Sequence, residues 1–101
     1  MMRIKGNSEN LEKFFSNIPA ELSKTWHVEG INMGGQKNYM SYYRGGNSSG
    51  INILEVRKEA YNSYYVTAAG GFVFLASTAM SAFASDFKLW ASACGVKIES
   101  N

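Results

Sequence analysis

The chain has 101 residues and a formal net charge of +2 at pH 7; 46% of its residues are hydrophobic and 18% are charged. That length suits a single domain spanning residues 1–101 with one core, and the hydrophobic share excludes an intrinsically disordered chain. Ten basic side chains scattered among eight acidic ones lack the clustered positive charge that is typical of nucleic-acid-binding domains.

The N-terminal part of the chain predicts a short strand and an amphipathic helix. A strand is expected over 2–5, and from residue 8 onward apolar residues recur at the i, i+3, i+4, i+7 spacing of one helix face. Asn7 or Ser8 can cap this helix. Pro19 interrupts it, so we expect a separate short helical turn over 20–24. The residues on the apolar face are Leu11, Phe14, Phe15, Ile18 and Leu22.

The middle of the chain reads as a run of β-hairpins, because short β-type segments alternate with glycine and small polar clusters. The alternation of apolar residues changes phase at Gly30, where we expect a bulge. The third strand has apolar residues in both phases and is therefore expected in the middle of the sheet. The four strands are expected at 26–33, 39–44, 51–58 and 63–68.

The stretch from Ala60 to Ser85 carries no charged side chain and is long enough to cross a bilayer as a helix. Its serines and threonines dilute the apolar content, and the Gly70-Gly71 pair separates a β-type first half from a second half with helical spacing. We therefore expect a strand followed by a buried helix instead of a membrane span. Residues 72–75 fit either the end of that strand or the start of that helix.

A helix end at Gly95 and an alternating segment over 96–99 complete the order of strand, helix, four strands, helix and strand. This order indicates a single α+β domain in which an antiparallel sheet meander carries two helices packed on one face. The order is similar to that of a ferredoxin-like fold with an extra hairpin, a likeness of architecture that implies no function.

Candidate catalytic and metal-binding residues are few. His27, the single histidine, and Glu29 share one face of a predicted strand, which leaves a small enzyme using His27 as one alternative, but no neighbouring nucleophile is indicated. Cys94, the single cysteine, lies on a buried helix face, where a thiol is a structural group. We expect no catalytic residue, no metal and no cofactor. The glycines at 70–71 read as a helix-entry turn and not as an anion-binding loop.

Aromatic residues are the one enrichment in the composition, at 14%, and all six tyrosines fall in the predicted meander. Strand alternation sends one tyrosine of each adjacent pair to the open face of the sheet. Tyrosine and arginine there would suit a protein interface. The candidate binding surface comprises Tyr39, Tyr42, Tyr43, Arg44, Lys37, Tyr64 and Tyr65.

These observations predict a small non-catalytic protein that binds another protein, as an inhibitor or adaptor acting on a larger host complex. In its small size and its lack of a catalytic set, the chain resembles the small inhibitors that phages and plasmids direct against host defence complexes, anti-CRISPR proteins included. A single-stranded nucleic-acid-binding module using Tyr42, Tyr43, Arg44 and Lys37 is the alternative, and homodimerisation stays open. With one cysteine and no apolar signal segment, a cytoplasmic location without membrane attachment is expected.

Overall fold

The computed structural model describes residues 2–33, 36–44, 53–69 and 73–100, except for the side chains of 31–33, 36–37, 69 and 73–78. The described residues form six strands and four helices. In chain order these are β1 (Met2–Lys5), α1 (Ser8–Ser16), α2 (Ala20–Ser23), β2 (Trp26–Met33), β3 (Gln36–Arg44), β4 (Ile53–Ala60), β5 (Ser63–Ala69), α3 (Val73–Asp86), α4 (Lys88–Cys94) and β6 (Lys97–Ser100).

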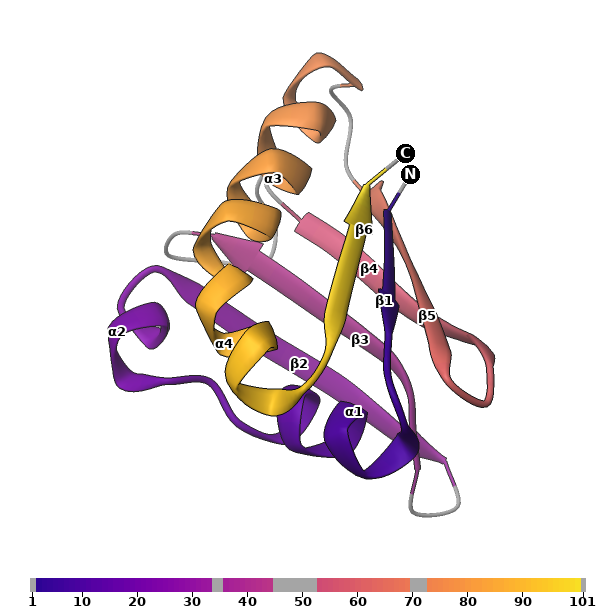
Figure 1. Cartoon of the computed structure of the whole chain (residues 1–101). Coiled ribbons are helices and arrows are strands. Elements are labelled where there is room, and N and C mark those ends of the chain that lie inside the picture. The colour runs from indigo at the N-terminus through magenta and orange to yellow at the C-terminus, as the bar shows by residue number, and fades with distance from the viewer. Residues whose placement is uncertain (1, 34–35, 45–52, 70–72, 101) are drawn as a thin grey trace.

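The strands form one antiparallel sheet in the order β2-β3-β4-β5-β1-β6. β1 lies between the last strand of the meander and the last strand of the chain, and β4 is an interior strand, as predicted. Figure 1 shows the helices on one side of this curved sheet, with β1 and β6 running at a steep angle to β2 and β3. The expected α+β architecture with an antiparallel sheet is confirmed.

Several strand ends differ from the predicted ones. β3 begins at Gln36 instead of residue 39, and β4 continues to Ala60 instead of ending at residue 58. The register shift of β2 falls between Ile31 and Asn32, just after the predicted position at Gly30. Gln36 lies opposite Met33, so pairing with β2 extends β3 toward its N-terminus. The alternation of residues within one segment cannot predict such a pairing with another strand.

The helices also differ in number from the two that were predicted. Pro19 is the N-cap of α2, which separates α2 from α1. The long C-terminal helix divides at Phe87, whose φ of −92° and ψ of 2° depart from helical values. α3 begins at Val73, so 73–75 belong to a helix. Among the described residues, no helix is long and apolar enough to cross a membrane.

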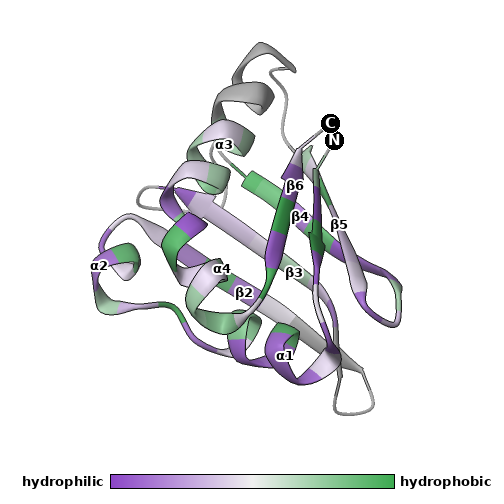
Figure 2. Ribbon diagram, viewed as in Figure 1, coloured by the Kyte–Doolittle hydropathy of each residue, from purple (hydrophilic) through white to green (hydrophobic). Residues whose placement is uncertain are grey.

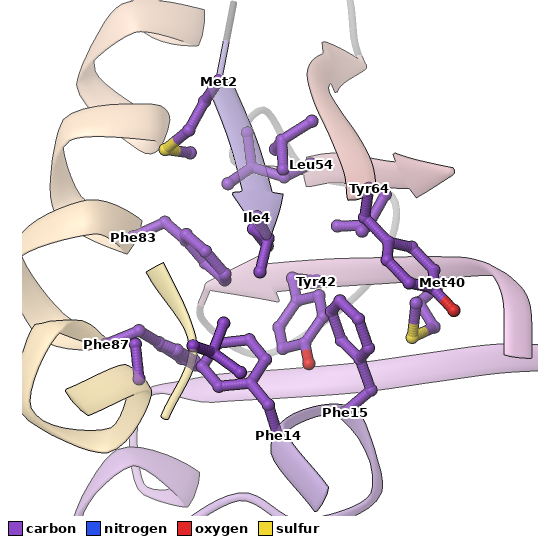
Figure 3. Close-up of a cluster of buried hydrophobic side chains, with 14 of the residues drawn as sticks. Met2, Ile4, Phe14, Phe15, Met40, Tyr42, Leu54, Tyr64, Phe83 and Phe87 are labelled. Carbon is purple, nitrogen blue, oxygen red and sulfur yellow. The ribbon is translucent and has the colours of Figure 1, made fainter. Parts of the chain in front are cut away.

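The core lies between the helices and one face of the sheet, and aromatic side chains make its centre (Figure 3). Phe83 stacks on Phe87 at a centroid distance of 4.4 Å, and both rings meet the edges or faces of Trp26 and Tyr42 at 5.2–5.7 Å. Such T-shaped pairs are stabilising beyond the apolar area they bury. Phe14 of α1 contacts Phe87 at 6.0 Å, so α1 and the α3–α4 segment share one core.

In the described part of the chain, no helix covers the other face of the sheet. In Figure 2, β1 and β6 alternate between hydrophobic and hydrophilic residues, as expected for a sheet with one covered face. In β1, Met2 and Ile4 are buried against the core, whereas Arg3 and Lys5 point to the opposite face. We call this opposite face, with its polar and aromatic side chains, the open face.

Candidate functional site on the open face

A row of tyrosine and arginine side chains crosses four strands of the open face. The sheet register places Tyr39 of β3 opposite Arg57 of β4, Arg57 opposite Tyr65 of β5, and Tyr65 opposite Arg3 of β1. The Arg57 guanidinium lies 5.2 Å from the centre of the Tyr39 ring, and the Arg3 guanidinium lies 6.0 Å from the centre of the Tyr65 ring. These are cation–π distances, so each cation holds a ring in place. We call these four residues the tyrosine–arginine row.

A second group on the open face joins β2 to β3. His27 lies opposite Tyr43 with ring centroids 5.2 Å apart, and the Tyr43 hydroxyl donates a hydrogen bond to Glu29 Oε1 at 3.4 Å. The structure thus brings His27 and Glu29 onto one face, as predicted, and the Glu29 carboxylate bonds to Tyr43. This arrangement orients the Tyr43 ring as a platform next to an exposed imidazole.

Both arginines of the tyrosine–arginine row are paired with carboxylates. Arg3 Nε lies 2.8 Å from Glu59 Oε1, and Arg57 pairs with Glu55 in the same strand. The hydrogen bonds from Arg3 and then from Ser63 lower the pKa of Glu59 below its usual value. These pairs are partly exposed and add little stability, but they neutralise the face locally.

A similar ion-pair group lies where β1 meets β6. Glu99 accepts from Lys5 at 3.1 Å and from Lys97 at 3.3 Å. The hydrogen bond from Lys5, followed by that from Lys97, lowers the pKa of the Glu99 carboxyl. Because Lys5 and Lys97 are cross-strand partners, Glu99 also relieves the repulsion between their like charges.

Three of the predicted surface residues, Tyr39, Tyr43 and Tyr65, lie on the open face, and two others do not. Tyr42 and Tyr64 are 1% and 6% exposed and point into the core, which corrects their inclusion in the candidate surface. The physical reason is that each is the inward member of an adjacent pair. Tyr42 meets Phe83 and Phe87, and burial raises the pKa of the Tyr42 hydroxyl far above its usual value. Figure 3 shows both rings directed into the apolar cluster.

Of the two predicted cations, Arg44 lies away from the tyrosine–arginine row, and only the backbone of Lys37 is described. Arg44 is at the end of β3 in the phase of the core side chains, and its guanidinium lies 5.7 Å from the centre of the Trp26 ring. Lys37 pairs through its backbone with Asn32, and its side chain is outside the described part of the structure. Arg44 is therefore not part of the tyrosine–arginine row, and the predicted role of Lys37 lies outside the described side chains.

The sequence-based surface left out Arg3, although this residue completes the row. β1 precedes the first helix, and Arg3 is 62 positions from Tyr65 in the chain, so no local pattern places the two side by side. Arg57 did carry a signal, because a charged residue that follows Val56 in an alternating strand is expected on the outward face.

The other candidate groups can be placed as follows. In the described part of the chain, no three His, Cys, Asp or Glu residues come together to hold a metal ion. Cys94 is buried, and that burial raises the pKa of its thiol, with a smaller opposite effect from Lys13. The predicted turn at Gly70-Gly71 lies outside the described residues.

No protein-family model, curated protein or solved structure matches the chain. A functional proposal consequently depends on the chemistry of the tyrosine–arginine row and the Tyr43 group.

Proposed function

We propose that this chain is a small non-catalytic module that binds another protein through its open face. The observation that carries the proposal is the tyrosine–arginine row, in which Arg57 and Arg3 hold Tyr39 and Tyr65 at cation–π distance. Tyrosine and arginine dominate the residues that contribute most to binding energy at protein interfaces. Rings that are already held lose little conformational freedom on binding, which favours affinity.

The charge balance of the open face supports a protein partner over a nucleic acid. Arg3, Arg57, Lys5 and Lys97 each pair with a glutamate of the same chain. Nucleic-acid binding depends on cations that neutralise phosphates, and these four would have to leave their carboxylate partners first. A protein partner with apolar and hydrogen-bonding groups requires no such exchange.

The biological setting that we propose is an inhibitor or adaptor in the cytoplasm that acts on a larger host complex, as small proteins of phages and mobile elements do. The size of the chain and its single sheet surface support this setting. A module of this kind works by covering a surface on its target, so its activity depends on affinity alone.

We also propose that the fold is an expanded ferredoxin-like arrangement. Its strand order supports this, because the last strand lies beside the first and the first lies beside the strand that precedes the C-terminal helices. Without β3 and β4, the strand order becomes β6-β1-β5-β2. The last strand is then followed by the first, the penultimate and the second, which is the order of a ferredoxin-like sheet.

The test is affinity capture from the source cell with matched tyrosine variants. Tyr39→Ala and Tyr65→Ala remove the rings of the row, and we expect each to reduce the captured protein at least about tenfold, as loss of a central interface aromatic does. Tyr61→Ala is the control, because Tyr61 is 74% exposed in the turn between β4 and β5. Equal loss with the control, or full capture by both row variants, contradicts the proposal.

A nuclease-treated lysate and a salt titration separate the two classes of partner. Capture of a protein that survives nuclease treatment and 0.5 M salt supports the proposed function. Binding of a single-stranded oligonucleotide that falls steeply between low and physiological salt would instead support the nucleic-acid alternative. Thermal unfolding of each variant, followed by circular dichroism, shows that the loss of capture does not come from loss of the fold.

A further inference from the structure

The edge strand β6 offers main-chain groups that no described strand pairs. β6 is the last strand of the sheet and pairs with β1 along one side only. An unpaired edge presents N–H and C=O groups that can accept a further strand. Each edge strand also contacts a helix, β2 with α2 and β6 with α4.

A groove of about 300 Å³ runs between β6 and the C-terminal helices. Ala84, Ala91, Val96 and Ile98 supply its apolar lining, and Lys88, Ser92 and Lys97 complete the lining. Ile98 is half-buried and lies in the phase of the core, opposite Ile4 of β1. A strand added beside β6 would therefore cover Ile98 on the helix side and approach Lys97 and Glu99 on the open face.

We propose that the strand added to β6 is β6 of a second copy of this chain, antiparallel and related by a two-fold axis at Ile98. In this register each Lys97 lies opposite Glu99 of the other copy, and the two Ile98 side chains lie side by side over the groove. A two-fold axis repeats the contact, so the interface holds two opposite-charge pairs. Lys97 pairs with Glu99 of its own chain at 3.3 Å, but 76% of its side chain is exposed, so its remaining N–H donors can reach a second carboxylate.

The other registers of this self-pairing are unfavourable. An axis at Lys97 would place the two lysines opposite each other, and an axis at Glu99 would do the same with the two carboxylates. A shift by one residue would place Ile98 opposite Glu99 and so mix the helix side with the open face. Like-charge repulsion in the other registers, and the need to keep Ile98 on the helix side of the sheet, both select the register centred on Ile98.

Such a dimer would continue the sheet across the axis and place both open faces on the same side. Two tyrosine–arginine rows would then face one partner, which raises avidity for a target with two equivalent sites. The dimer itself does not depend on the proposed function. The variants that test the dimer lie in β6, and those that test partner binding lie in the tyrosine–arginine row, so failure of one proposal can be told from failure of the other.

The test is the molar mass of the purified chain in sedimentation equilibrium over a range of micromolar concentrations. We expect a reversible dimer, because a four-residue strand with a neighbouring helix forms a small interface. Lys97→Glu and Glu99→Lys each place like charges in both cross-strand pairs, and each is expected to raise the dissociation constant at least about tenfold. Glu21→Lys on α2 is the charge-matched control for Glu99→Lys and leaves the dimer unchanged.

Mixing the two single variants is the sharpest arm of the test. A Lys97→Glu chain opposite a Glu99→Lys chain restores opposite charges in both pairs, so two monomeric variants should form a 1:1 heterodimer. Lys97→Glu also places a carboxylate opposite Lys5 of its own chain, so its fold is expected to persist. The proposal is overturned by a wild-type chain that stays monomeric at 200 µM, by a dimer that ignores both reversals, or by variants that stay monomeric when mixed.

Discussion

Individual buried aromatic residues account for much of the stability expected of this small domain. Phe83 is fully buried and touches Trp26, Tyr42 and Phe87, so its removal leaves a cavity that these rigid rings cannot fill. We expect Phe83→Ala to lower the free energy of unfolding by about 3–5 kcal/mol in a denaturant titration. Leu89→Ala, at a side chain that is 83% exposed, should stay within about 0.5 kcal/mol of the wild type. Similar losses for both variants would contradict this account of the core.

The single thiol should be unreactive in the folded chain. Cys94 is buried at the end of α4, and burial raises the pKa of its thiol, so little thiolate is present at neutral pH. We expect the reaction of Cys94 with a chromogenic disulfide reagent at pH 7.5 to be at least about a hundredfold slower in the native chain than in the urea-unfolded chain. Equal rates in the two states would show that the C-terminal end of α4 is open.

The junction between α4 and β6 depends on one left-handed residue. Gly95 has φ of +74°, its N–H bonds to the carbonyls of Ala91 and Ser92, and an added Cβ would lie 2.7 Å from Asn10 Nδ2. We expect Gly95→Ala to lower the free energy of unfolding by about 1–2 kcal/mol, because a left-handed backbone is strained for alanine. Gly6→Ala is the control. Its Cβ would lie 3.4 Å from Val96 Cγ2, so a smaller loss is expected, and an equal loss would remove the conformational argument.

The pairing of β1 with its neighbours should make stability depend on pH. Folding lowers the pKa of Glu59 and Glu99 below their ordinary value of 4.5, so the folded state favours both carboxylates. Their stabilisation is therefore present above pH 4.5 and is lost as the pH falls through the lower pKa of the folded state. We expect Glu59→Gln to destabilise the chain at pH 7 and to approach wild-type stability as the pH decreases toward 3.

Urea titrations across this pH range check the expectation, with Glu12→Gln on the exposed side of α1 as the matched control. The Glu59→Gln effect should also shrink in 1 M salt, because the Arg3–Glu59 pair is partly exposed. A difference from the wild type that is the same at pH 7 and pH 3 would show that the carboxylate does not stabilise the sheet.

Most elements of the fold could be predicted, but the candidate site could be predicted only in part. The apolar spacing of Leu11, Phe14 and Phe15 predicts α1 correctly, and all three side chains are buried. The tyrosine pairs predicted that one member of each would face outward, which placed Tyr43 and Tyr65 within the candidate surface. The same reasoning could not choose between Tyr42 and Tyr43, because either phase of an isolated strand satisfies the alternation.

The uncharged stretch from Ala60 to Ser85 illustrates the division between local and long-range information. Its change of period at Gly70-Gly71 predicted a strand followed by a helix, which are β5 and α3. Composition and periodicity specify such elements because they act between residues close in the chain. The strand order that places Arg3 beside Tyr65, and leaves β6 at an edge, depends on contacts between distant segments. Packing of the helices on one face of the sheet selects that order, so the open face emerges only when the sheet is assembled.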